Sequence, residues 1–332
     1  MSEQVGNKRN LILLIAAFAA VYIIWGSTYL GIKYALDTIP TFLMAGFRFT
    51  VAGTVLFLIA RFSKGYETPK LSQWRTPVIV GAFLLLGGNG GVVIAEHYVS
   101  SSLTALLVAT VPFWVVLFSW LFKGERPNLM VIGGLLIGFV GVWMLIPASN
   151  GSEGSSQLFG AIMLIAASAS WALGTLYGSR GETVKSPILN AAMQMLSGGA
   201  MLLLVGTVTG EWAKFDINAI SRTSWIALIY LIVIGAIVAY TAYSWLLKNA
   251  SPAMVSTYAY VNPAIAVFLG WAIAGETLTG KMLLGAAIII GSVALITANK
   301  KAAKKEEPKE LLDEKTDDNT FGSAGVRERF ST

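Results

Sequence analysis

The sequence predicts an all-helical integral membrane protein built from two related five-helix halves. Of the 332 residues, 55% are hydrophobic and only 13% are charged, whereas roughly 25% are charged in soluble domains. Ten segments are apolar over the length of about 20 residues that a helix needs to cross the hydrocarbon layer. A stretch in the second half also repeats a stretch in the first half at a fixed offset.

The ten apolar segments are predicted to be helices, because in lipid each backbone polar group must be satisfied within its own segment. Strands of a membrane barrel would be about ten residues long with alternating polarity, and that pattern is absent. The predicted spans are residues 11–33, 41–61, 76–96, 101–122, 129–147, 158–178, 188–209, 223–247, 253–273 and 281–298.

The repeat places residues 251–276 on residues 100–125 without a gap. The matched residues are Ser251, Pro263, Trp271, Gly275 and Glu276 on Ser100, Pro112, Trp120, Gly124 and Glu125. Further upstream, Trp25 aligns with Trp171 and Gly53 with Gly199. Because a five-helix unit crosses the membrane an odd number of times, the two halves are predicted to be inverted.

The repeat and the composition together divide the chain into five parts. We expect a cytoplasmic N-terminus over residues 1–10, a first repeat over 11–147, an extracytoplasmic linker over 148–157, a second repeat over 158–298 and a tail over 299–332. The tail is charged, of mixed sign and poor in aromatic residues, which predicts disorder.

Lysine and arginine in the loops predict the orientation, because cytoplasmic loops carry the excess of basic residues. With the N-terminus inside, eleven basic residues lie in inner segments and four in outer loops. The inner residues are Lys8, Arg9, Arg61, Lys64, Lys70, Arg75, Lys123, Arg126, Arg180, Lys185 and Lys248, and the outer ones are Lys33, Lys214, Arg222 and Lys281. The cytoplasmic membrane is therefore the predicted location, with both termini in the cytoplasm.

Several function classes are disfavoured by what the chain lacks. The basic residues form no continuous patch for nucleic acid, and the absence of cysteine together with a single histidine leaves no ordinary zinc site. Residues 275–281 fit most of a P-loop, but Met282 replaces the serine or threonine that would bind magnesium. No catalytic constellation, metal, cofactor or nucleotide is therefore expected.

Several motifs together resemble a known family. They are IIWGSTYLGIKYAL, FRF, GNG with AEH, VATVP with GE, SWALGTLYGSR and SPAMVSTYAYVNPAIAVFLG with GE. The chain resembles EamA-type carriers of the drug/metabolite transporter superfamily over about residues 11–298, and is most similar to the YedA-type bacterial exporters. The resemblance implies ten helices around a central cavity and secondary transport of small metabolites, usually efflux.

Charged side chains inside a span are expensive and point to function. Arg48 lies about seven residues into its helix, roughly 10 Å deep at 1.5 Å per residue. It either extends to the outer headgroups or faces the cavity, where it would pair with a substrate carboxylate or with Glu96. Glu96 and His97 end the third span, and they are either solvated loop residues or a site that binds and releases a proton.

Glycine and proline mark candidate moving parts. Asn89 lies among four glycines of the third span, a pattern that predicts a close-packed kink with the amide lining the cavity. Pro112 and Pro263 occupy matched positions and are predicted to lie in the middle of helices. Each would remove one backbone hydrogen bond and favour a kink. These prolines either act in gating or only shape the packing.

Aromatic residues complete the predicted substrate site. Trp25, Trp171, Tyr243 and Tyr258 lie in helices that the family resemblance places around the cavity, and their rings suit an amphipathic organic substrate. The alternative is that they belong to the aromatic belts at the membrane surface. Asn262 can offer its amide next to the carbonyl that Pro263 leaves free.

The sequence thus favours a carrier that exports amino acids or amphipathic drug-like compounds by alternating access. A membrane-embedded lipid-modifying enzyme and a non-transporting scaffold are the alternatives. Catalysis needs several converging ionisable groups, and this chain has few, so we expect no enzyme. The expected partners are a small-molecule substrate and the lipid bilayer, with the protein working as a monomer or a homodimer.

Overall fold

The computed structural model describes residues 2–124, 126–145, 151–179, 181–249 and 258–295. Within these residues the chain forms helices and no strand, so the predicted helical class is confirmed for the described part. The predicted tail over residues 299–332 lies outside the described residues. The predicted linker over 148–157 lies partly outside them, and helix α8 (Gly151–Gly178) begins within it.

Seven described helical segments are long and apolar enough to cross a membrane. They are Ile12–Leu36, Thr41–Arg61, Leu71–Ala95, Ser101–Phe122, Gly154–Gly178, Pro187–Val208 and Arg222–Tyr243. Three apolar helices are shorter, namely Leu129–Leu145, Val261–Ala272 and Gly280–Leu295. The protein is therefore a helical membrane protein, and a total of ten crossings stays a prediction for the three shorter helices.

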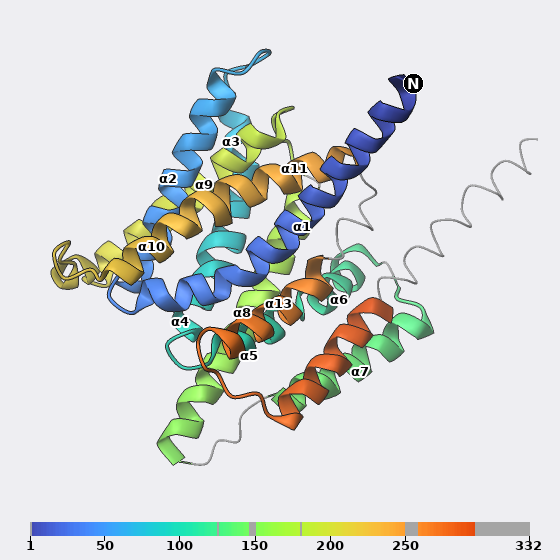
Figure 1. Ribbon diagram of the computed structural model, residues 1–332, viewed down its shortest axis with the longest axis vertical. Coiled ribbons are helices and arrows are strands. Elements are labelled where there is room, and N and C mark those ends of the chain that lie inside the picture. Colours follow the sequence, from blue (N-terminus) through green and yellow to red (C-terminus); the bar gives the residue numbers. More distant parts are fainter. Residues whose placement is uncertain (1, 125, 146–150, 180, 250–257, 296–332) are drawn as a thin grey trace, which may run out of the picture.

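The first half of the chain contains α1 to α7 (Figure 1). The bounds are α1 (Ser2–Leu36), α2 (Thr41–Arg61), α3 (Leu71–Gly81), the π-helix η1 (Ala82–Asn89), α4 (Gly90–Ala95), α5 (Ser101–Val108), α6 (Val111–Lys123) and α7 (Leu129–Leu145). Segments α3, η1 and α4 follow one another directly and form one span.

The second half begins with α8 and ends beyond α13. Its remaining elements are α9 (Pro187–Val208), the 3-10 helix η2 (Glu211–Lys214), α10 (Arg222–Tyr230), the π-helix η3 (Leu231–Val238), α11 (Ala239–Asn249), α13 (Tyr258–Ala272) and the helix Gly280–Leu295. The π-helix thus recurs in the span that follows the second span of each predicted half. Such wide turns inside helices often mark functional sites.

The prediction that Pro112 lies in the middle of a helix is wrong. Helix α5 ends at Val108, and Pro112 occupies the first turn of α6, with Thr110 as the N-cap residue. Proline is favoured there because the first-turn amide has no partner within the helix. The span over residues 101–122 is therefore interrupted instead of kinked. Pro263 does lie inside α13, as predicted.

Glycine allows helices of the two halves to approach closely. A Cβ atom on Gly53 of α2 would lie 2.9 Å from the backbone nitrogen of Leu196 in α9, and one on Gly199 would lie 2.7 Å from the nitrogen of Thr50. Near the other side of the bundle, a Cβ on Gly141 of α7 would lie 2.9 Å from Ile288. Small residues of this kind are the usual contacts of membrane helices.

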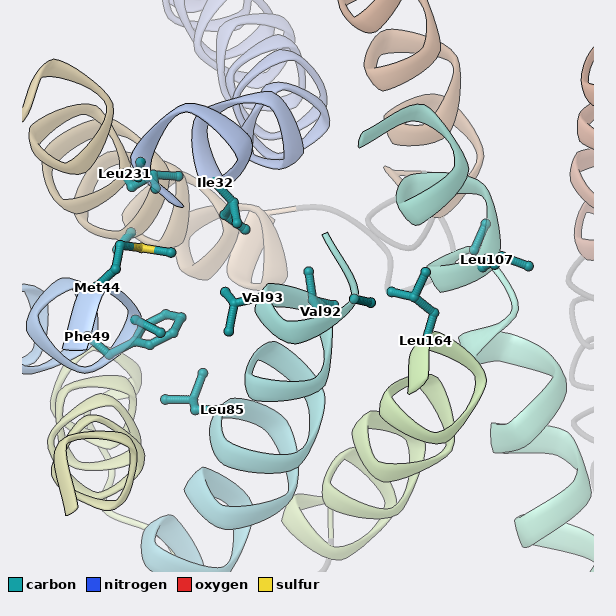
Figure 2. Close-up of a cluster of buried hydrophobic side chains, with 14 of the residues drawn as sticks. Ile32, Met44, Phe49, Leu85, Val92, Val93, Leu107, Leu164 and Leu231 are labelled. Carbon is teal, nitrogen blue, oxygen red and sulfur yellow. The ribbon is translucent and has the colours of Figure 1, made fainter. Parts of the chain in front are cut away.

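Apolar side chains from both halves form the largest buried cluster. Figure 2 shows Val92 and Val93 of α4 at its centre, with Ile32, Phe49 and Leu231 from other helices turned towards them. All five are at most 7% exposed. This cluster packs α1, α2, α4 and η3 together around the polar residues described next.

The two ends of the bundle carry different connections. Hydrogen bonds link the segments 37–41, 96–102, 211–221 and 273–276, and we call this side the Glu276 end. On the other side, Lys185 pairs with Glu67 at 3.0 Å, and we call that side the Glu67 end. The loop charges predict that the Glu67 end is cytoplasmic.

Candidate functional site

Arg48 is the buried cation of the bundle. Its side chain lies within α2 and is 6% exposed, so it does not extend to the membrane surface. The guanidinium carbon lies 4.8 Å above the ring centre of Phe49, and Nη2 lies near Gly235 of η3. Among the described residues it has no hydrogen bond or ion pair, and its Nε is enclosed without a partner.

Glu96 is an acidic residue within electrostatic range of Arg48 that also lacks a partner. Both carboxylate oxygens are enclosed and accept no hydrogen bond from a described residue. The carboxylate interacts electrostatically with Glu276, Lys33 and Arg48 but forms no direct ion pair with them. An unpaired buried charge is costly, so Arg48 and Glu96 are the two groups of this bundle that a ligand would satisfy best.

His97 does not share the environment of Glu96. Its ring is exposed, and Nε2 lies 2.8 Å from Oγ1 of Thr41 at the start of α2. The two neighbours therefore point to different surroundings, and the pairing proposed from their adjacency is not seen.

Two tyrosines that the sequence analysis did not select border the Arg48 region. Tyr29 of α1 lies within electrostatic range of both Arg48 and Glu96. Tyr230 at the end of α10 shares a hydrogen bond of 2.5 Å with Ser27 of α1. Position alone could not distinguish these residues from the other tyrosines in apolar spans.

An aromatic cluster joins three helices of different parts of the chain. The ring of Trp25 in α1 lies 5.1 Å from that of Tyr243 in α11 and 5.0 Å from that of Tyr258 in α13. Tyr240 is 6.0 Å from Tyr243 and extends the group. The structure thus brings together three of the four aromatic residues predicted to contact substrate.

Asn262 has partners within the protein. With its amide oriented to suit its surroundings, the nitrogen donates to the carbonyls of Tyr258 at 3.1 Å and Tyr22 at 3.2 Å. The side chain is 7% exposed and thereby joins α13 to α1. These contacts fix α13 against α1, and the contact of Asn262 with substrate stays a prediction.

Asn89 and Trp171 lie at a separate contact, between η1 and α8. The Asn89 amide donates to the carbonyl of Leu84 at 3.4 Å. A Cβ atom on Gly88 would lie 2.8 Å from Cε3 of Trp171. The glycine cluster therefore serves close packing and lies within and next to the π-helix η1. A kink there and the contact of Asn89 with a cavity stay predictions.

Carboxylates hold two helix N-termini at the Glu276 end. Glu276 accepts hydrogen bonds from the backbone N–H of Ser101 at 3.0 Å and of Ser102 at 3.1 Å. In the same way, Glu211 accepts from the N–H of Phe42 and of Leu43, at 2.9 and 3.0 Å. The free N–H groups and the dipole of a helix N-terminus favour such anions.

The pKa of Glu276 reflects these contacts. Burial alone would raise it, but hydrogen bonds from Ser102, Lys33 and Ser101 outweigh that effect and lower the pKa from 4.5 to about 2. Glu276 is therefore charged at any physiological pH.

The glycine of the repeated Gly-Glu motif has the same backbone conformation in both halves. Gly124 and Gly275 adopt left-handed conformations, with φ of 68° and 65°. Glycine reaches this region without steric cost. The repeat singled out Glu276 as a matched residue, but nothing in its spacing indicated that its carboxylate would reach α5.

Comparison with known proteins agrees with this architecture. The model of the EamA-like transporter family matches the chain twice, over residues 11–146 and 158–298. An uncharacterized inner membrane transporter of Escherichia coli K12, YedA, is 38% identical over 294 residues, which cover 88% of this chain and 93% of that protein. An uncharacterized transporter of Bacillus subtilis, YvbV, is 27% identical over 91% of this chain and 96% of its own length.

A solved structure shares the fold. One protein crystal structure with 19% sequence identity superposes with a TM-score of 0.59, over 87% of this chain and 98% of the other. The family model matches most of the chain in two copies, and a relative at 38% identity is matched over nearly its whole length. The chain therefore belongs to the EamA-like transporter family.

Proposed function

We propose that the protein is a secondary transporter that exports small organic metabolites, amino acids or amphipathic drug-like compounds, across the cytoplasmic membrane. The observation that carries the proposal is the enclosed Arg48 guanidinium, which has no hydrogen-bond partner among the described residues. A carboxylate on the substrate would supply the missing partner through two parallel hydrogen bonds. The YedA relative is named an inner membrane transporter, which supports the location.

The aromatic cluster of Trp25, Tyr243 and Tyr258 would take the apolar part of the substrate. Its rings meet edge to face or at a tilt, and rings that carry a polar group suit an amphipathic molecule. Trp171 and Asn89, at the contact between η1 and α8, are proposed to contact the same substrate. Such a site suits an organic molecule with a charged end better than an inorganic ion.

Alternating access is the proposed mechanism. The two family matches, the recurring π-helix and the left-handed glycines Gly124 and Gly275 support two halves of common origin. Inverted halves can exchange conformations and so open the site to each side of the membrane in turn. Pro263 inside α13 and the break before Pro112 are the proposed points of movement.

The test is transport into proteoliposomes of a panel of labelled amino acids and cationic drugs, with and without a pH gradient. We expect Arg48→Gln to lower transport of carboxylate-bearing substrates by tenfold or more and Arg48→Lys to retain part of it, because lysine keeps the charge but loses the fork. Arg75→Gln, at an exposed position, is the matched control. The absence of any moving solute, or lipid turnover in its place, would refute the proposal.

Glu96 is the proposed site of proton coupling. Its enclosed carboxylate has no hydrogen-bond partner, so binding a proton costs less free energy than keeping an unpaired charge. In the same assay, Glu96→Gln should abolish any stimulation of transport by the pH gradient. His97→Gln is the control, since that ring is exposed and bound to Thr41. Equal loss in both variants would place the coupling elsewhere.

A further inference from the structure

Glu276 is the most fully satisfied carboxylate at its end of the bundle. Oε1 accepts from Nζ of Lys33 at 2.9 Å and from Oγ of Ser101 at 2.8 Å, and Oε2 accepts from Oγ of Ser102 at 2.5 Å. The two backbone N–H groups of these serines complete the set. We call Glu276, Lys33, Ser101 and Ser102 the Glu276 cluster.

The cluster joins three separate parts of the chain. Lys33 belongs to the last turn of α1, the two serines begin α5, and Glu276 follows α13. The first two elements fall within the first family match and Glu276 within the second. The cluster therefore fastens one half to the other, and it does so at the Glu276 end.

Burial makes these contacts stronger than a surface ion pair. The Glu276 side chain is 7% exposed and that of Lys33 is 35% exposed. In the pair Lys185–Glu67, the distance from Nζ to Oε1 is nearly the same, but the two side chains are 86% and 72% exposed. Water and salt screen an exposed pair so that it contributes little, whereas hydrogen bonds to an enclosed charge are the strong ones.

The backbone around Glu276 is shaped for close approach. Gly275 takes a left-handed conformation, and the N–H of Glu276 donates to the carbonyl of Gly270 at 3.0 Å. A side chain on Gly270 would collide with Ser102 Oγ and Glu276 Oε2. Glycine at these two positions therefore permits the carboxylate to reach α5.

We propose that the Glu276 cluster is a latch that holds the Glu276 end of the transporter closed, and that it must separate before substrate can leave on that side. The inference rests on the proposed transport function. Because α1 and α13 both carry members of the aromatic cluster, separation of Lys33 from Glu276 would loosen the same helices that surround the substrate. Closure of one end is thereby linked to the shape of the site.

A cysteine reporter tests the latch directly, because the chain contains no cysteine of its own. Thr28→Cys places a thiol on α1 at a position that is 8% exposed. A membrane-impermeant thiol reagent is added from the side of the Glu276 end, and its rate of reaction is measured in intact cells. Loss of the latch should raise this rate about tenfold, because that factor corresponds to the free energy of a hydrogen bond to an enclosed charged group.

The variants are Glu276→Gln, Lys33→Met and the double change Ser101→Ala with Ser102→Ala, each in the Thr28→Cys background. The matched control is Glu67→Gln, which breaks the exposed pair at the other end. Thermal unfolding of each purified protein shows that it is folded, and the serine variant serves if Glu276→Gln does not fold. We expect faster labelling in all three latch variants and no change in the control.

An unchanged labelling rate in folded latch variants would overturn the proposal, and so would an equal rise in the control. The outcome is separate from that of the transport assay. If wild-type protein moves no solute but the latch variants label faster, the proposed function fails while the latch stands. If transport is found and the rates do not respond, the latch fails alone.

Discussion

Three ionisable residues of the bundle, Arg48, Glu96 and Glu276, differ in how many hydrogen bonds they form. Glu276 receives five hydrogen bonds from Lys33 and two serines. Arg48 donates none to the described residues and Glu96 accepts none from them, although the two lie within electrostatic range of each other. The hydrogen bonds of Glu276 show that this bundle can provide partners for an enclosed charged group. The unpaired charges of Arg48 and Glu96 are thus best understood as functional.

The low pKa of Glu276 predicts how stability responds to acid. The folded state lowers this pKa from 4.5 to about 2, so the unfolded chain binds the proton more readily. The contribution of Glu276 to stability is complete above the ordinary pKa, falls as the pH drops from there, and is gone below the folded-state pKa.

We therefore expect wild-type protein to lose more thermal stability than Glu276→Gln between about pH 6 and about pH 3. Scanning fluorimetry of the detergent-solubilised proteins measures this difference. Glu67→Gln, whose partner Lys185 is exposed, should follow the wild-type profile. Parallel profiles for wild type and Glu276→Gln would contradict the assigned pKa.

At the scale of elements, two glycines of the cluster differ in how closely a neighbouring side chain packs against them. A Cβ on Gly88 would come within 2.8 Å of Trp171, whereas one on Gly90 would reach only an ordinary contact distance of 3.4 Å from Leu202. Gly88→Ala should displace the indole and raise the substrate concentration needed for half-maximal transport several-fold. Gly90→Ala should leave it unchanged, and an equal effect of the two would argue against Trp171 as a substrate contact.

The contact between α2 and α9 is predicted to tolerate no side chain. A Cβ on Gly199 would lie 2.6 Å from Oγ1 and 2.7 Å from the nitrogen of Thr50, and backbone atoms cannot move aside as a flexible side chain does. We expect Gly199→Ala to lower the unfolding temperature by several degrees, because overpacking costs about 1 to 3 kcal/mol.

Gly133→Ala in α7 is the control for this substitution, since no atom lies within 4 Å of the added Cβ. Alanine favours a helix more than glycine does, so this variant should be at least as stable as wild type. Comparable loss in both would show that the α2–α9 contact is not the cause.

At the scale of the whole molecule, the predicted topology can be tested with two cysteines. Ser63 and Asn218 are both exposed, one at the Glu67 end and one at the Glu276 end. Five predicted spans separate them, among them the short helix Leu129–Leu145. An impermeant maleimide should label Asn218→Cys in intact cells and Ser63→Cys only after lysis. Labelling of both from one side would mean that one of the five segments does not cross.

Much of the fold could be predicted because membranes restrict the possibilities. Apolar length alone located the seven long spans to within five residues at each end: the span 41–61 was predicted with its observed bounds, and the span predicted over 188–209 is observed over 187–208. The break before Pro112 was missed because a proline in the first turn of a new helix and a proline within a helix look the same in an apolar run. The π-helices were missed as well, since no sequence pattern distinguishes a wide turn.

The site was predictable only where a residue type was unusual for its place. A lone arginine in an apolar helix pointed to Arg48, whose burial is confirmed, while its contact with substrate stays a prediction. Lys33 and Glu276 escaped notice as a pair because 243 residues separate them, and lysine at a helix end is ordinary. Contacts between distant loops depend on the packing of the whole bundle, which composition does not reveal.

The two carboxylates that cap helix N-termini also allow the opening rate of this end of the bundle to be measured. Glu211 and Glu276 hold the backbone amides of Phe42, Leu43, Ser101 and Ser102 across the boundary between the two family matches. Each of these hydrogens can exchange with deuterium only after its hydrogen bond has broken, and parting of the halves at this end breaks all four together. Their exchange rates therefore count how often the end opens, in unmodified protein and without knowledge of the substrate.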